Sequence, residues 1–312
     1  MHTSPGPSVP ENDRVLRFAH DAMATTFELF IAATGSDTAR HAAREAFNLI
    51  DRLESLLSRF NPCSDIAQVN RLQPGQSVRV APDVFECLAI AMAASRETQG
   101  AFDSSIGPVI QCWRNDDGMR KSPAESELAA ARSRTGMSRI ELDQDSFSVA
   151  LRPDGPAAGV ILDLGAIGKG FALDKVASLL EEWDIGHALL NAGSSTVLAL
   201  GPPGDQPGWP VAVGGSWGQA AGIAPLVLAN QALSGSGTEL QGPHILDPAS
   251  GMPATAHRAA WAVCPSATVA DALSTAFMVM PTEAARAYCA SHAVVRAWVV
   301  LPEGTLVSFP SA

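Results

Sequence analysis

Strand-like and helical segments are grouped along this chain rather than strictly alternating, and the grouping limits the folds that it can adopt. Near the start, Phe27, Leu29 and Ile31 share one face of a predicted strand at 23–33. Helices are expected at about 37–60, 82–100, 123–136, 168–183, 268–280 and 283–291, and strands at 159–163, 187–191, 196–200, 210–213, 225–228, 259–264, 294–300 and 305–309, with a hairpin around 143–145. This order favours an α+β fold over a doubly wound parallel sheet.

One domain is expected at 21–312, because no internal repeat and no change of composition divides the chain. Residues 1–20 begin with a polar, proline-rich stretch, which predicts a flexible tail. This stretch has neither the basic start nor the apolar run of a secretory signal, and no segment approaches the roughly 20 apolar residues of a membrane span. We therefore expect a cytoplasmic protein without membrane insertion.

The charge balance excludes one large class of partners. The chain has 21 Lys and Arg against 32 Asp and Glu, a net charge of −11. A protein this acidic is not attracted to nucleic acid or to an anionic membrane surface. Its five cysteines are far apart and form no C-x-x-C pair, which argues against a structural zinc site and a disulfide framework.

The segment Leu162-Asp-Leu-Gly-Ala-Ile-Gly-Lys-Gly170 leads through glycines into a predicted helix. Glycines let a ligand approach the backbone, and a helix N-terminus offers amide groups and a positive dipole to an anion. Lys169 stands where that dipole disfavours a cation, which indicates an anionic ligand nearby. The alternative is a tight turn with a solvated lysine.

The segment Thr268-Val-Ala-Asp-Ala-Leu-Ser-Thr-Ala276 offers oxygen ligands. In a helix, Asp271 and Thr275 share a face, with Ser274 beside them. One carboxylate with hydroxyl groups is a plausible partial shell for Mg²⁺, which usually completes its coordination with water and substrate phosphate. The alternative is a capping box formed by Thr268 and Asp271.

Two loops add candidates of lower specificity. Gly242-Pro-His-Ile-Leu-Asp-Pro-Ala-Ser-Gly251 carries His244 beside a turn signal, so this histidine is either a base, a phosphate ligand or a structural residue. Gly100-Ala-Phe-Asp103 follows a helix, and Asp103 could simply cap the next element.

Taken in order, these segments resemble one family. Three further segments match the same family: Met23-Ala-Thr25, Ser58-Arg-Phe-Asn-Pro-Cys-Ser-Asp65 with Asn70, and Gly107-Pro108. From about Met23 to Phe309 the chain resembles the FAD:protein FMN transferases, also called the ApbE family.

The resemblance implies an α+β fold of mixed or antiparallel sheets with helices packed around an FAD cleft, and a divalent ion at the pyrophosphate. It implies a backbone carbonyl ligand for Mg²⁺ from Ala166 and side-chain ligands from Asp271, Ser274 and Thr275. It places Met23, Phe60, Ala101, Phe102, Asp103, Asp163, Lys169 and Ile245 at the FAD site, and Asp271 and His244 in the chemistry.

The implied reaction is phosphoryl transfer to a threonine or serine hydroxyl of an acceptor flavoprotein, with FAD as substrate and AMP as leaving group. Some members of the family hydrolyse FAD to FMN and AMP instead, and a flavin-binding protein without activity is a further alternative. The chain departs from the family pattern at Phe60, Ser194-Ser195 and Ser234-Gly-Ser-Gly237, which puts FAD affinity and acceptor choice in doubt more than the metal site.

Overall fold

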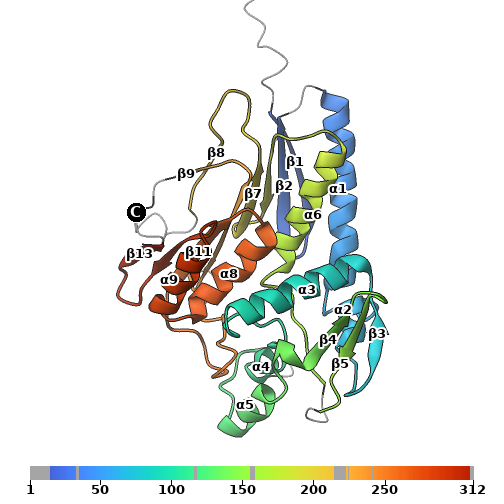
Figure 1. The fold of residues 1–312 in the computed structure, drawn as a ribbon, viewed down its shortest axis with the longest axis vertical. Coiled ribbons are helices and arrows are strands. Elements are labelled where there is room, and N and C mark those ends of the chain that lie inside the picture. Colours follow the sequence, from blue (N-terminus) through green and yellow to red (C-terminus); the bar gives the residue numbers. More distant parts are fainter. Residues whose placement is uncertain are drawn as a thin grey trace, which may run out of the picture.

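The computed structural model describes residues 15–309 except 33–34, 116–117, 155–158, 214–222, 224 and 240–241. Within that part of the chain the main feature is an antiparallel sheet of eight strands in the order β1-β2-β6-β7-β10-β11-β12-β13 (Figure 1). These strands are β1 (Val15–Ala22), β2 (Thr25–Ala32), β6 (Ala188–Ala192), β7 (Thr196–Leu200), β10 (Gln231–Gly237), β11 (Ala259–Cys264), β12 (Arg296–Val300) and β13 (Leu306–Phe309).

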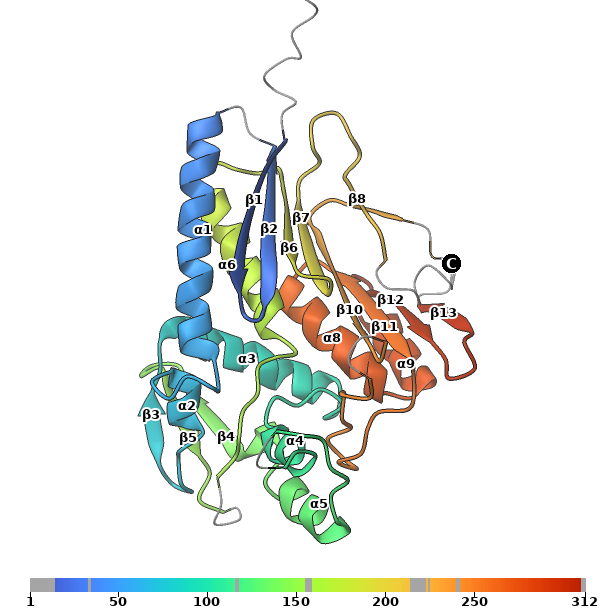
Figure 2. The ribbon, with the colours of Figure 1, turned by 180° about the vertical axis from the view of Figure 1, so that it is seen from behind.

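Helices cover one face of this sheet, and both views show α1, α6, α8 and α9 on the same side of it (Figures 1 and 2). Their bounds are α1 (Ser36–Leu57), α6 (Gly168–Glu182), α8 (Ala267–Val279) and α9 (Thr282–Ser291). The side chains of Phe27, Leu29 and Ile31 on β2 are fully buried in the core between the layers, as their alternation predicted.

The opposite face carries a second apolar cluster around Trp209 and Trp261, and β8 (Trp209–Val211) pairs with β9 (Leu226–Leu228) over part of it. All residues of β7 and of β11 are buried, because these central strands are covered on both faces. This explains why Ala259–Cys264 reads as a continuous apolar run rather than an alternating one.

Smaller elements lie at one end of the main sheet (Figure 2). A three-stranded sheet has the order β3-β5-β4, and its β4–β5 hairpin is the one predicted around 143–145. The remaining elements are α2 (Asp65–Val69), β3 (Ser77–Arg79), α3 (Pro82–Glu97), α4 (Gly107–Cys112), α5 (Glu125–Arg132), the 3₁₀ turn Met137–Arg139, β4 (Ile140–Asp143) and β5 (Ser148–Leu151).

Two predictions about this architecture need correction. The predicted tail of residues 1–20 ends too late, because Val15 already pairs with Ala32 at the start of the β1–β2 hairpin; residues 1–14 lie outside the described part. The predicted strand at 159–163 is reduced to a single bridge between Ile161 and Ile106. The side chain of Asn70 takes the place of a strand partner there, accepting a hydrogen bond from the Leu162 amide at 2.6 Å and donating one to its carbonyl at 3.1 Å.

The described part of the chain contains no helix that is both long and apolar enough to cross a bilayer.

Candidate functional site

A cavity of about 760 Å³ opens where the start of α6, the middle of α8 and several loops meet. Its walls bring together residues that are far apart in the sequence. The predicted site residues in these walls are Met23, Ala101, Phe102, Asp103, Asp163, Ala166, Lys169, His244, Ile245, Asp271 and Thr275. Phe60 and Ser274 are predicted site residues that do not line the cavity.

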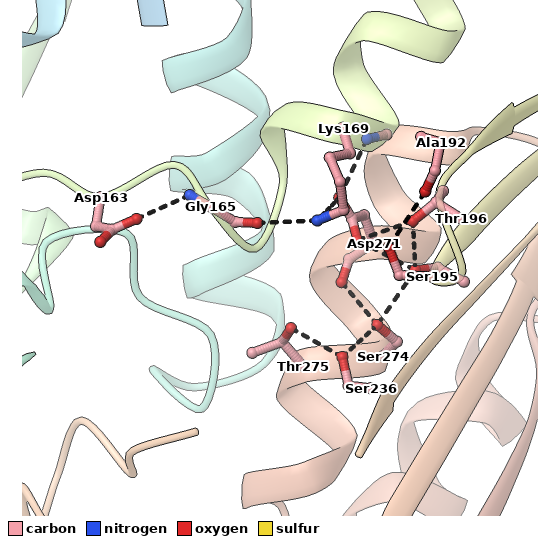
Figure 3. Close-up of polar contacts among 12 residues, drawn as sticks. Asp163, Gly165, Lys169, Ala192, Ser195, Thr196, Ser236, Asp271, Ser274 and Thr275 are labelled. Atoms are coloured by element: carbon pink, nitrogen blue, oxygen red, sulfur yellow. Dashed lines mark hydrogen bonds and ion pairs between the residues drawn. The ribbon is translucent and has the colours of Figure 1, made fainter. Parts of the chain in front are cut away.

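Asp271 on α8 lines the cavity and belongs to a group of polar contacts next to the start of α6 (Figure 3). Its side chain is almost fully buried, and Oδ1 accepts hydrogen bonds from Thr196 Oγ1 and Ser234 Oγ, both at 3.1 Å. Thr196 and Ser234 are direct partners on the adjacent strands β7 and β10, so the sheet places both hydroxyl groups under the carboxylate. The oxygen Oδ2 accepts a hydrogen bond from the Gly170 amide at 3.1 Å.

The contact between Asp271 and Gly170 joins α8 to the first turn of α6. The first amides of a helix have no partner within the helix, so a carboxylate from a neighbouring helix can accept from them. Gly170 is required for this approach, since a Cβ added there would lie 2.2 Å from the Ala267 carbonyl oxygen. The alternative prediction, in which Asp271 helps to cap its own helix, is wrong. The N-cap of α8 is Ser266, whose side-chain oxygen accepts a hydrogen bond from the Val269 amide.

Lys169 lies beside this junction. Its Nζ donates a hydrogen bond to the Gly165 carbonyl at 3.2 Å and is 3.9 Å from Asp271 Oδ2 (Figure 3). The ammonium group is only partly exposed, and Gly165 and Ala166 line the cavity next to it. A positive side chain and the amides of a helix N-terminus are groups that can bind an anion.

A row of hydroxyl groups continues from Asp271 along α8. Ser236 Oγ on β10 lies 2.9 Å from Ser274 Oγ and 3.2 Å from Thr275 Oγ1. Ser274 is buried and donates to the Asp271 carbonyl at 2.9 Å, so its hydroxyl serves the packing of α8 against β10. Ser236 and Thr275 line the cavity instead.

Asp163 holds the guanidinium group of Arg59 at the cavity wall. Its Oδ2 forms an ion pair with Arg59 Nε at 2.8 Å, and its Oδ1 accepts from the Gly165 amide at 2.9 Å. Arg59 lines the cavity. Phe60 does not; this residue is 80% exposed, and the centre of its ring lies 4.2 Å from the central carbon of the Arg59 guanidinium. The sequence motif at 58–65 therefore does reach the cavity, but the residue of this motif that lines it is Arg59 and not the predicted Phe60.

Asp103 is fixed in the cavity wall by three hydrogen bonds. Its Oδ1 accepts from the amide and the hydroxyl of Ser105 at 2.7 and 2.5 Å, and its Oδ2 accepts from the Met137 amide at 3.2 Å. Burial raises the pKa of Asp103, and the hydrogen bonds from Ser105 and Met137 lower it in part. Asp103 thus links the loop after α3 to the turn before β4.

The β1–β2 turn brings Met23 to the cavity in a strained backbone conformation. Met23 and Ala24 have φ angles of 50° and 57°, in the left-handed region that disfavours side chains larger than glycine. A two-residue hairpin turn with positive φ at both positions matches the twist of the paired strands. Such strain persists only where the surroundings impose it, and it often marks a functional segment.

His244 is exposed at the cavity, and its Nδ1 lies 3.0 Å from the Gly242 carbonyl oxygen. A carbonyl oxygen can only accept, so this contact places a proton on Nδ1. In the neutral ring Nε2 is then free to accept a proton. Ile245 and Pro248 of the same loop also line the cavity.

Sequence reasoning missed Arg59, Thr196, Ser234 and Ser236 as parts of the site. Arg59 stands inside a motif that was noticed, so its charge was an available signal. Ser234 and Ser236 lie in a segment that was noticed only as a departure from the family pattern, and Thr196 carried no signal. The place of Thr196 and Ser234 beside Asp271 depends on the pairing of β7 with β10. The described residues contain no group of three or more His, Cys, Asp or Glu that could hold a metal ion.

Comparison with known proteins gives a consistent result. A family model described as the ApbE family matches residues 23–299. A protein of Klebsiella pneumoniae named FAD:protein FMN transferase is 32% identical over 220 residues, which cover 68% of this chain and 66% of that protein. A second FAD:protein FMN transferase, from Haemophilus influenzae, is 28% identical over 285 residues, which cover 86% and 81%.

Solved structures show the same architecture. The apo form of the Pseudomonas stutzeri flavinyl transferase ApbE has a TM-score of 0.82 at 25% identity and covers 96% of both chains. An ApbE protein from Thermotoga maritima also has a TM-score of 0.82 at 25% identity, covering 94% of this chain and 96% of its own. These similarities confirm the predicted α+β fold.

Proposed function

The chain belongs to the ApbE family, and we propose that it transfers the FMN half of FAD to a threonine or serine hydroxyl of an acceptor protein, in a Mg²⁺-dependent reaction that releases AMP. The relatives named FAD:protein FMN transferase support this activity. The observation that carries the proposal is the buried Asp271 carboxylate beside Lys169 and the start of α6, in the wall of a cavity of about 760 Å³. Cavities of this size hold small ligands.

The residues present fit a Mg²⁺ ion. A carboxylate has about four lone-pair positions, and hydrogen bonds from Thr196, Ser234 and Gly170 use three of those on Asp271. One position on Oδ2 remains, on the oxygen that lies nearest Lys169. Thr275 and Ala166 line the same cavity, and a hydroxyl group and a backbone carbonyl from these residues would give the oxygen-rich, partial donor set that Mg²⁺ takes when substrate phosphate completes it.

Asp271, Thr275 and the Ala166 carbonyl would hold the ion, and Ser236 stands at the cavity where Ser274 was predicted. When bound, Mg²⁺ supplies neutralisation of the charge on the pyrophosphate. The protein itself supplies a positive charge from Lys169 and the N-terminal amides of α6. Arg59 adds a further positive charge on the cavity wall.

The transfer needs a group that takes the proton of the attacking hydroxyl. We assign this role to Nε2 of His244, because Nδ1 is occupied by the Gly242 carbonyl. The acceptor oxygen forms a bond to the FMN-side phosphorus, the bond from that phosphorus to AMP breaks, and AMP leaves with the bridging oxygen. The acceptor proton passes to His244 as the new bond forms.

Intact-mass analysis tests the proposal. The purified protein is incubated with FAD, Mg²⁺ and candidate acceptor flavoproteins, and AMP is measured in parallel. We expect a mass increase of one FMN phosphoester on the acceptor together with AMP release. AMP and free FMN without acceptor modification would identify a hydrolase, and FAD binding without AMP would identify a binding protein.

A further inference from the structure

Asp174, on α6, is bound to the start of α8 by four hydrogen bonds. Oδ1 accepts from the Ala267 amide at 2.8 Å. Oδ2 accepts from the Ser266 hydroxyl at 2.6 Å, and from the amide and hydroxyl of Thr268 at 2.9 and 2.6 Å. All four donors belong to the N-cap or the first two residues of α8, so this carboxylate serves a helix other than its own.

The contact is reciprocal with the one at the cavity. Asp174 on α6 accepts from the Ala267 amide of α8, and Asp271 on α8 accepts from the Gly170 amide of α6. Each carboxylate stands four residues after the amide donor on its own helix, which places donor and acceptor on one helix face. The two helices are therefore joined by a pair of exchanged contacts, with Gly170 packed against the Ala267 backbone between them.

This pair determines where Asp271 lies. The Asp271 backbone belongs to the turn of α8 that follows the turn held by Asp174. If the first turn of α8 shifts or rotates, Asp271 leaves its place over Gly170 and over the hydroxyl groups of Thr196 and Ser234. Asp174 does not line the cavity, so its effect on the site acts through α8 and not through contact with a ligand.

We propose that Asp174 is a positioning residue for the metal-site carboxylate: by holding the first turn of α8 against α6, it fixes the place and direction of Asp271. The inference rests on the proposed function for the role of Asp271. Groups that orient metal ligands change metal affinity or activity by about 10- to 100-fold when they are removed. Asp174 is accordingly expected to control the affinity of the site for a divalent ion while leaving the affinity for FAD unchanged.

The test compares Asp174→Asn with wild-type protein. Asparagine keeps the shape but replaces one accepting oxygen with an amide that faces donors of α8. Glu181→Gln is the matched control, because Glu181 is an exposed acidic residue of the same helix. Three quantities are measured: Mn²⁺ affinity by electron paramagnetic resonance, FAD affinity without metal by flavin fluorescence, and thermal unfolding.

We expect Asp174→Asn to weaken Mn²⁺ binding about tenfold or more, with FAD affinity within about threefold of wild type. The control should match wild type in all three measurements. A purely structural role would lower the melting temperature and leave Mn²⁺ affinity of the folded protein unchanged. Unchanged Mn²⁺ affinity in folded Asp174→Asn, or absence of Mn²⁺ binding in wild type, would overturn the inference.

A milder variant keeps the test valid if Asp174→Asn does not fold. Thr268→Val removes one of the four donors without changing side-chain size, and it should weaken Mn²⁺ binding in the same direction by a smaller factor. Normal Mn²⁺ affinity in folded Thr268→Val, with Asp174→Asn unable to fold, would also overturn the inference. Because Mn²⁺ binding is measured without FAD turnover, failure of the proposed reaction would show as absent AMP release with Asp174-dependent Mn²⁺ binding intact.

Discussion

Lys169 Nζ lies 3.9 Å from Asp271 Oδ2, between the first turn of α6 and the second turn of α8. The distance is longer than a hydrogen bond, because the ammonium group donates to the Gly165 carbonyl instead. The negative charge of Asp271 is thereby partly compensated by the ammonium group, which does not occupy the remaining lone-pair position of Oδ2. This arrangement suits a carboxylate that binds a cation in the presence of a phosphate bound by the lysine.

The close approach of α6 and α8 gives a stability prediction. Gly170→Ala places a methyl group 2.2 Å from the Ala267 carbonyl oxygen, so the helices must move apart. We expect a loss of roughly 1–3 kcal/mol and a melting temperature several degrees lower. Gly168→Ala is the control in the same turn, since an added Cβ there meets nothing within 4 Å. Equal melting temperatures for the two variants would contradict the packing argument.

Arg59 and Phe60 should differ in their effect on FAD binding. Arg59→Gln removes a positive charge from the cavity wall, and we expect the FAD dissociation constant to rise roughly tenfold, as for one charge-assisted contact. Phe60→Ala shortens a residue that is 80% exposed and does not line the cavity, and the constant should stay within about threefold of wild type. Flavin fluorescence titration measures both. A larger effect from Phe60→Ala would support its predicted contact with the flavin.

His244→Ala separates binding from chemistry. If Nε2 takes the acceptor proton, transfer should slow by about 10²–10⁴-fold while FAD affinity stays within a few-fold. His244→Gln keeps a polar side chain without a base and should be equally slow. Parallel loss of FAD affinity and transfer would indicate phosphate binding instead, and near-normal transfer by folded His244→Ala would remove this residue from the mechanism.

His257 makes stability depend on pH. Its buried ring contacts the Phe277 carbonyl oxygen through Nδ1 at 2.5 Å and Thr282 Oγ1 through Nε2 at 3.0 Å. Burial lowers the pKa of His257, and the contact with the Phe277 carbonyl raises it in part. The folded state therefore favours the neutral ring, and the unfolded chain takes up the proton at higher pH. The stabilisation is present above about pH 6.5 and is lost as pH falls through the lowered pKa.

Urea unfolding between pH 7.5 and 5.5 tests this. We expect the unfolding free energy of wild type to fall with pH by up to about 1.4 kcal/mol per unit more than that of His257→Gln. His41→Gln, at an exposed position of α1, should follow wild type. Parallel curves for wild type and His257→Gln would show that this histidine does not contribute.

The strands whose bounds could be predicted accurately were those that are buried along their whole length and therefore have a continuously apolar sequence. The bounds of β7 and β11 agree with the predicted 196–200 and 259–264, because covered strands are continuously apolar. The strand β10 was missed: its sequence, Gln-Ala-Leu-Ser-Gly-Ser-Gly, is typical of a turn, and only pairing with β7 and β11 holds it extended.

The same limit applies to the site. Asp271, Thr275 and Lys169 were candidates because each lies in a short motif, and the resemblance to the ApbE family, not local geometry, favoured a site role over the capping and solvated-lysine alternatives. Ser234 and Asp174 could not, since their partners on α8 are far along the chain and meet them only through sheet pairing or helix packing. Ser274 was placed correctly on its helix, but its buried hydroxyl is used within the protein.

The most direct test of the central claim is AMP release from FAD by wild type and Asp271→Asn, measured against Mg²⁺ concentration and in excess chelator. Asp184→Asn, an exposed carboxylate change, is the control. We predict that chelator stops AMP release by wild type and that Asp271→Asn releases AMP at least 10²-fold more slowly at all Mg²⁺ concentrations, while still folding. AMP release at the full rate in chelator, or a folded and fully active Asp271→Asn, would contradict the account.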